Sequence, residues 1–126
     1  MKKPIIGCHL LVDIFNVSPA ILQECEQIHR AFYTALCRGG MHILGKERCH
    51  IFENQGSTLL YILQESHAAL HTYPEHGFIS LDIYSCSSMD PRKVVDLFLK
   101  NLNRTVRVHT RILERGGQSL AGGGEE

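Results

Sequence analysis

The segment that decides the fold runs from Thr58 to Cys86 and reads TLLYILQESHAALHTYPEHGFISLDIYSC. It holds three runs rich in aliphatic and aromatic residues, at 58–64, 68–73 and 77–86, with short polar connections between them. In the third run the apolar residues alternate with polar ones, which is the pattern of a strand with one buried face. Consecutive strands joined by such short connections pair antiparallel. The segment therefore predicts three neighbouring strands of an antiparallel sheet.

The flanking sequence predicts three more strands and two helices. The strands are expected at 4–15, 41–53 and 105–113. The first helix begins at Ser18–Pro19, which supplies an N-cap and a proline at the first helical position, and ends at Gly39–Gly40. The second helix opens at Asp90–Pro91 in the same way. Both helices carry an apolar stripe along one face, so each can pack on a sheet.

The order of these elements is strand, helix, four strands, helix, strand. It predicts an α+β two-layer sandwich, in which an antiparallel β-sheet carries two helices packed on one face. The length of 126 residues suits one domain, which we expect over 1–115. From Gly116 onward the sequence is mostly glycine, serine and glutamate, so residues 116–126 are expected to form a disordered tail.

Composition excludes several classes of function. Thirteen Lys and Arg balance thirteen Asp and Glu, so the chain has no excess positive charge to hold nucleic acid. No apolar run approaches the roughly 20 residues that span a bilayer, and we expect a cytoplasmic protein with no membrane partner. The five cysteines are an odd number without a Cys-x-x-Cys pair, which favours free thiols.

Chemically active side chains concentrate in the polar segment 64–76. A metal site at His67 and His71 is disfavoured, because on a strand these residues stand roughly 13 Å apart. A serine hydrolase site at Ser66 lacks the Gly-x-Ser-x-Gly motif. The residues alone favour a third interpretation, in which the segment forms the polar, exposed face of a sheet.

Three motifs in this region carry a family resemblance. They are ESH at 65–67, HTYPE at 71–75 and DIYSC at 82–86, in that order. Together with matching positions from about Gly7 to Gly116, they resemble the prokaryotic S-adenosylmethionine decarboxylase proenzymes. The resemblance implies a two-layer α/β sandwich and a pyruvoyl-dependent decarboxylase that supplies the aminopropyl donor for spermidine synthesis.

The resemblance also implies self-processing. Ser66 attacks the carbonyl of Glu65, and the chain divides into 1–65 and 66–126, with a pyruvoyl group derived from Ser66 at the new N-terminus. That carbonyl forms a Schiff base with the substrate amine and accepts the charge left by decarboxylation. His71 is implied as the base that removes the α-proton of residue 66, and Thr58 stands where the family has a supporting serine. Cys86 is implied as the proton donor to the decarboxylated carbon.

For the substrate, the resemblance implies that Phe52 and Tyr73 stack on both sides of the adenine and that Glu75 accepts hydrogen bonds from the ribose hydroxyls. It implies a homodimer of cleaved protomers that binds S-adenosylmethionine. Two alternatives remain open. One is an arginine or ornithine decarboxylase with the same pyruvoyl chemistry, and the other is an uncleaved homologue that binds a ligand without catalysis.

Overall fold

A computed structural model describes residues 4–86 and 89–117 and contains six strands and three α-helices in these ranges. In chain order the elements are β1 (Ile5–Phe15), α1 (Pro19–Leu22), α2 (Cys25–Arg38), β2 (Ile43–Ile51), β3 (Ser57–Leu63), β4 (Ser66–Tyr73), the 3-10 turn η1 (Pro74–His76), β5 (Phe78–Ser85), α3 (Arg92–Leu99) and β6 (Arg107–Gly116). No helix in the described ranges is long and apolar enough to cross a membrane.

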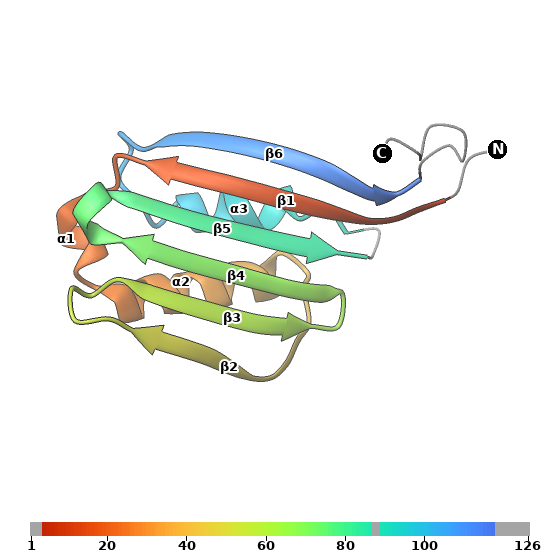
Figure 1. The fold of residues 1–126 in the computed structure, drawn as a ribbon, viewed down its shortest axis with the longest axis horizontal. Helices are drawn as coiled ribbons and strands as arrows, with labels where there is room; N and C mark the ends of the chain where they lie inside the picture. The colour runs from red at the N-terminus through yellow and green to blue at the C-terminus, as the bar shows by residue number, and fades with distance from the viewer. Residues whose placement is uncertain (1–3, 87–88, 118–126) are drawn as a thin grey trace.

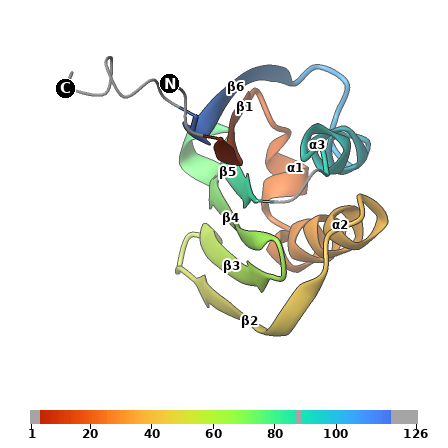
Figure 2. The same ribbon diagram turned by 90° about the vertical axis from the view of Figure 1, so that its right-hand side faces the viewer.

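The six strands form one antiparallel sheet with the order β2-β3-β4-β5-β1-β6 (Figure 1). All described helices lie on one face of this sheet, and no described helix covers the opposite face, which we call the bare face (Figure 2). The predicted α+β two-layer sandwich is confirmed. The helix predicted from Ser18 to Gly39 is divided into α1 and α2, because Glu24 adopts the non-helical angles φ −105° and ψ 61°. This break lets Leu22 and the stripe of α2 both reach the core.

The boundaries differ in two places that matter for function. Strand β4 begins at Ser66, two residues earlier than predicted, so this serine is paired with Ser85 of β5. Strand β6 continues to Gly116, which therefore belongs to the sheet, while residues 118–126 of the predicted tail lie outside the described residues.

The core lies between the sheet and the two longer helices. Strand residues such as Leu10, Leu70 and Ile83 are fully buried and alternate with more exposed ones, as the sequence pattern requires. Phe32 of α2 and Phe98 of α3 are also fully buried, with ring centroids 5.7 Å apart in an edge-to-face arrangement. The helices thus anchor one face of the sheet and leave the other free to carry polar groups.

Antiparallel pairing determines which functional residues share an end of the sheet. The first residues of β4 lie beside the last residues of β5, at the end where β1 begins. The last residues of β4 and the turn between β2 and β3 lie at the opposite end (Figure 1).

Candidate functional site

The cleavage-site cluster consists of Glu65, Ser66 and Cys86. The turn after β3 places Glu65 next to Cys86 at the end of β5. The carbonyl oxygen of Glu65 accepts two hydrogen bonds from Cys86, one from the backbone N–H and one from Sγ, each 2.9 Å long. Two donors on one oxygen are the arrangement that stabilises negative charge when a nucleophile adds to a carbonyl.

The side chain of Glu65 is held away from this reaction centre. It is only 6% exposed. His42 donates its backbone N–H to Oε1 at 3.0 Å, and His42 Nδ1 lies 2.6 Å from Oε2. Burial alone would raise the pKa of Glu65, but the hydrogen bonds from His42 outweigh it and hold the pKa below its ordinary 4.5. The ionised carboxylate therefore anchors the turn that presents the Glu65–Ser66 peptide bond.

This anchor predicts a pH-dependent contribution to stability. A carboxyl whose pKa is lowered by folding stabilises the native state above its ordinary pKa, and the stabilisation is lost as pH falls through the lowered value. We expect Glu65→Gln to reduce the free energy of unfolding at pH 7 by about 1 kcal/mol. The difference from Glu65 should shrink below pH 4.5. Urea unfolding of both chains in a Ser66→Ala background measures it, and an equal difference at pH 7 and pH 3.5 would contradict the assignment.

A second group of predicted residues meets at the other end of the sheet, in a cavity of about 680 Å³ that we call the turn pocket. Its lining residues are Phe52, Glu53, Asn54, Gly56, Ser57, Thr58, Thr72, Tyr73 and Glu75. The structure thus brings together the two aromatic residues, the hydroxyl residue and the carboxylate that the sequence singled out. The lining contains two acidic side chains and no Lys, Arg or His, so the turn pocket is suited to a cationic ligand.

His71 lies beside the turn pocket. It pairs with Thr58 across β3 and β4, and Thr58 Oγ1 is 3.2 Å from His71 Nδ1. A hydrogen bond at Nδ1 fixes the orientation of the imidazole ring and leaves Nε2 available for proton transfer. The structure thus places side by side two residues to which the resemblance assigns separate roles in processing.

The β2–β3 turn positions the wall of the turn pocket through residues whose types are typical of turns. Gly56 N–H donates to Asn54 Oδ1 at 2.9 Å, and Asn54 Nδ2 donates to Glu75 Oε1 at 3.0 Å. Phe52 N–H donates to the Gly56 carbonyl at 2.7 Å, which closes the turn. A Cβ on Gly56 would lie 3.0 Å from both Asn54 Oδ1 and the Thr72 carbonyl oxygen, so the close approach requires glycine.

Helix α2 supports the same wall from below. His29 Nε2 lies 2.8 Å from Ser57 Oγ, and the Ser57 N–H donates to Thr72 Oγ1 at 3.0 Å. Burial lowers the pKa of His29, which favours the neutral ring as a hydrogen-bonding partner. The only sequence signal for this contact was the position of His29 beside the buried stripe of the helix.

One chain does not bring the two groups together. Ser66 and His71 are five positions apart on β4, which corresponds to about 16 Å along a strand. The cleavage-site cluster lies at the end of β5, and the β2–β3 turn that lines the turn pocket lies at the opposite end of the sheet (Figure 1). Within a single protomer, His71 therefore cannot remove the α-proton of Ser66.

Three aromatic rings form a cluster on the bare face of the sheet near the cleavage-site cluster. The ring centroids of Tyr84, His67 and His9 lie 5.5 to 6.0 Å from one another. His9 Nε2 is 3.4 Å from Asp82 Oδ2, while Asp82 Oδ1 is buried and has no hydrogen-bond partner among the described residues. This arrangement leaves acceptor capacity on the face that the helices do not cover.

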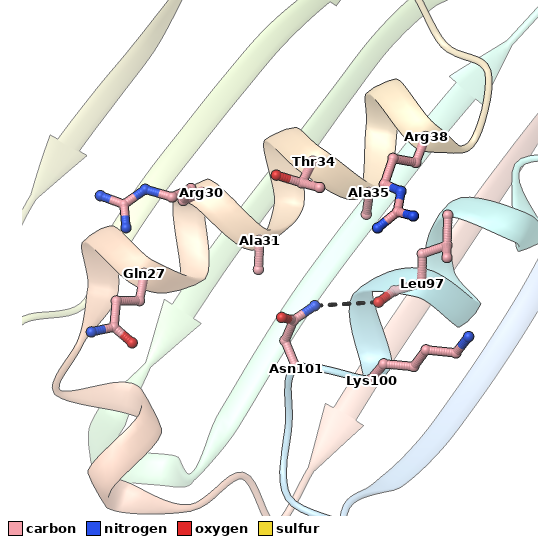
Figure 3. A pocket seen from close by; sticks show the side chains of 9 residues that line it. All are labelled: Gln27, Arg30, Ala31, Thr34, Ala35, Arg38, Leu97, Lys100 and Asn101. Carbon is pink, nitrogen blue, oxygen red and sulfur yellow. Dashed lines mark hydrogen bonds between the residues drawn. The ribbon is translucent and has the colours of Figure 1, made fainter.

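A different cavity, of about 510 Å³, lies between α2 and α3 (Figure 3). Arg30, Arg38 and Lys100 line it together with small apolar side chains, and Asn101 Nδ2 donates to the Leu97 carbonyl inside it. Its lining contains no carboxylate, imidazole or thiol. It also contains none of the residues that the resemblance implies for catalysis or substrate binding. Within the described residues, no group of three or more His, Cys, Asp or Glu side chains could hold a metal ion.

Comparison with known proteins gives a consistent result. The family model for S-adenosylmethionine decarboxylase matches residues 8–116. The S-adenosylmethionine decarboxylase proenzyme 2 of Bacillus cereus is 32% identical over 117 residues, covering 92% of this chain and 94% of that protein. The proenzyme of Brevibacillus brevis is also 32% identical, over 92% of this chain and 86% of that protein. The crystal structure of the adenosylmethionine decarboxylase from Aquifex aeolicus has a TM-score of 0.78 at 27% identity, covering 92% of this chain and 95% of that one.

Proposed function

Because the chain belongs to the S-adenosylmethionine decarboxylase family of pyruvoyl-dependent lyases, we propose that it is made as a proenzyme that cuts itself between Glu65 and Ser66 and then decarboxylates S-adenosylmethionine. The observation that carries this proposal is the pair of Cys86 donors on the carbonyl oxygen of Glu65. This peptide bond, unlike an ordinary one in a β-turn, is set up for addition of a hydroxyl to its carbonyl carbon.

The cleavage conserves atoms in three steps. Ser66 Oγ adds to the Glu65 carbonyl carbon, the C–N bond breaks, and an ester with a free amine on residue 66 results. Removal of the α-proton of residue 66 then breaks the ester. The main-chain carboxylate of Glu65 leaves as the new C-terminus, and residue 66 becomes dehydroalanine. Water then replaces its nitrogen, which leaves as ammonia, and a pyruvoyl group begins the chain 66–126. The two Cys86 donors hold the negative charge of the first step.

The residues at this position fit the pyruvoyl group, because its precursor serine follows a carbonyl that is already hydrogen-bonded. When present, the group supplies a carbonyl that accepts electrons from the substrate during loss of carbon dioxide. Cys86 remains beside the group after cleavage, and its Sγ–H can deliver the proton to the decarboxylated carbon.

We place His71 and Thr58 in the same site through a homodimer, in which one copy supplies the cleavage-site cluster and its partner supplies the turn pocket. The separation of about 16 Å within one chain requires a second copy if the imidazole is to reach the α-proton. The bare sheet face suits such a contact, because it carries exposed apolar residues. These are Leu44, Leu60, Ile62, Tyr73 and Leu113. Asp82 Oδ1, which is buried and has no hydrogen-bond partner among the described residues, also faces this side.

In this arrangement the turn pocket binds the adenosyl part of the substrate. Phe52 and Tyr73 offer rings for the adenine, with about 1–3 kcal/mol for each stacked contact by analogy with nucleic-acid bases. Glu75 accepts from the ribose hydroxyls. The excess of acidic over basic side chains in the lining favours the sulfonium cation.

The test uses the purified protein with its unaltered sequence. We expect denaturing mass spectrometry to find two polypeptides that meet at 65/66, and carbon dioxide release from S-adenosylmethionine but not from arginine or ornithine. An intact chain of 126 residues would contradict self-cleavage. Cleaved protein that releases carbon dioxide only from arginine or ornithine would keep the chemistry and overturn the substrate.

A further inference from the structure

We propose that Asn54 is a positioning residue for the substrate, which acts by orienting the carboxylate of Glu75 while leaving its negative charge unpaired. The inference rests on the proposed function of the turn pocket. It assigns a specific role to a residue of the β2–β3 turn that touches no reacting atom.

The side chain of Asn54 bridges the turn and the carboxylate. Its Oδ1 accepts from the Gly56 N–H at 2.9 Å, and its Nδ2 donates to Glu75 Oε1 at 3.0 Å. The first hydrogen bond determines which end of the amide faces the backbone, because only an oxygen can accept from an N–H. The end of the amide that faces Glu75 must therefore be the NH₂ group, which can donate to a carboxylate. Gly56 is buried, and a Cβ at this position would lie 3.0 Å from Asn54 Oδ1, so a glycine permits the close approach of the amide.

The Glu75 side chain needs such support because the surrounding chain does little to fix its orientation. It lies in the three-residue turn η1 and is exposed. An exposed glutamate side chain ordinarily samples several rotamers, and restricting it on ligand binding costs side-chain entropy. The contact with Asn54 fixes Oε1 before the ligand arrives. Oε2 has no partner among the described residues and is left to accept from hydroxyl groups of the ligand.

The chemistry of the donor also matters. An arginine or lysine at the same place would hold the carboxylate more strongly but would cancel its charge. No described cation forms an ion pair with Glu75, and the lining of the turn pocket contains no basic side chain. A neutral amide thus orients Glu75 and preserves the negative potential that attracts a sulfonium cation.

Four variants separate this role from a merely structural one. Asn54→Ser keeps a hydroxyl oxygen that can accept from the Gly56 N–H, as serine does in such turns, but it is too short to reach Glu75. Asn54→Ala removes both contacts. Glu75→Ala removes the carboxylate, and the double variant Asn54→Ser/Glu75→Ala completes a cycle. The measurements are kcat and KM for S-adenosylmethionine with the self-cleaved enzymes.

We expect Asn54→Ser and Asn54→Ala to raise KM about tenfold with kcat within about twofold of the original, the signature of lost binding shared by ground state and transition state. In the Glu75→Ala background, Asn54→Ser should change KM by less than about twofold, since its effect runs through the missing carboxylate. An unchanged KM in Asn54→Ser, or a tenfold effect that persists without Glu75, would overturn the inference while leaving the proposed function intact. Absence of turnover by the original enzyme would overturn both.

Discussion

Ser66→Ala should leave the chain as one polypeptide and abolish decarboxylation completely. The hydroxyl oxygen is the only atom of residue 66 that can add to the Glu65 carbonyl carbon, and an alanine side chain has no substitute for it. The substitution removes only the hydroxyl group. It leaves strand β4, the pairing of residue 66 with Ser85 and the Cys86 hydrogen bonds in place. Loss of the product therefore follows from loss of the nucleophile, because without cleavage no pyruvoyl group can form.

Mass spectrometry under denaturing conditions measures this result directly. The original chain should give fragments 1–65 and 66–126, the second lighter by one ammonia than a fragment beginning with serine. Cys86→Ala is the matched comparison. It keeps the Ser66 hydroxyl and the backbone N–H donor but removes the Sγ donor, so cleavage should slow by about 10²-fold and still reach completion. A cut at 65/66 in Ser66→Ala protein would rule out the hydroxyl as the nucleophile.

Coexpression of Ser66→Ala chains with His71→Ala chains should restore cleavage that neither variant carries out alone. If each site combines the cleavage-site cluster of one copy with His71 of the other, a mixed dimer has one complete site and one site that lacks both groups. Random mixing makes about half of the dimers mixed, so about a quarter of all sites should be complete. If each site were instead formed by a single chain, every site would lack either the Ser66 hydroxyl or the His71 imidazole, and no chain would be cut.

Different affinity tags on the two variants identify which chain is cut. The geometry predicts cleavage only in the His71→Ala chain, because that chain retains Ser66 and receives the imidazole from its partner. The control is coexpression of two differently tagged Ser66→Ala chains, which should stay intact. Cleavage absent from purified mixed dimers would contradict the shared site and would require His71 to act elsewhere.

The sequence predicted the sheet well because its signals are local. Alternation at 79, 81 and 83 places apolar side chains on one face, and the structure buries those three residues almost completely. The association of Thr58 with His71 follows from the register of β3 and β4. By contrast, the break between α1 and α2 depends on how Leu22 and α2 reach one core, which helical periodicity does not encode.

The sequence proposes members for the candidate site, but it does not show how they are arranged. Motif order along the chain places Ser66 and His71 close in sequence, whereas a strand separates them by about 16 Å. The hydrogen bond between His42 and Glu65 joins residues 23 positions apart, so no local sequence pattern predicts it. Asn54 looked like an ordinary turn residue, because its hydrogen bond to Glu75 depends on the approach of two turns at one end of the sheet.

The strand order has a consequence for the protein once the proposed cleavage between Glu65 and Ser66 has taken place. The N-terminal polypeptide contributes β1, β2 and β3, and the C-terminal polypeptide contributes β4, β5 and β6. Strand β1 lies between β5 and β6, so a strand of one polypeptide is enclosed by two strands of the other. The two pieces are interlocked and cannot part without dismantling the sheet. Thermal unfolding of one cleaved protomer therefore releases two separate polypeptides. The midpoint temperature of unfolding should rise with protein concentration.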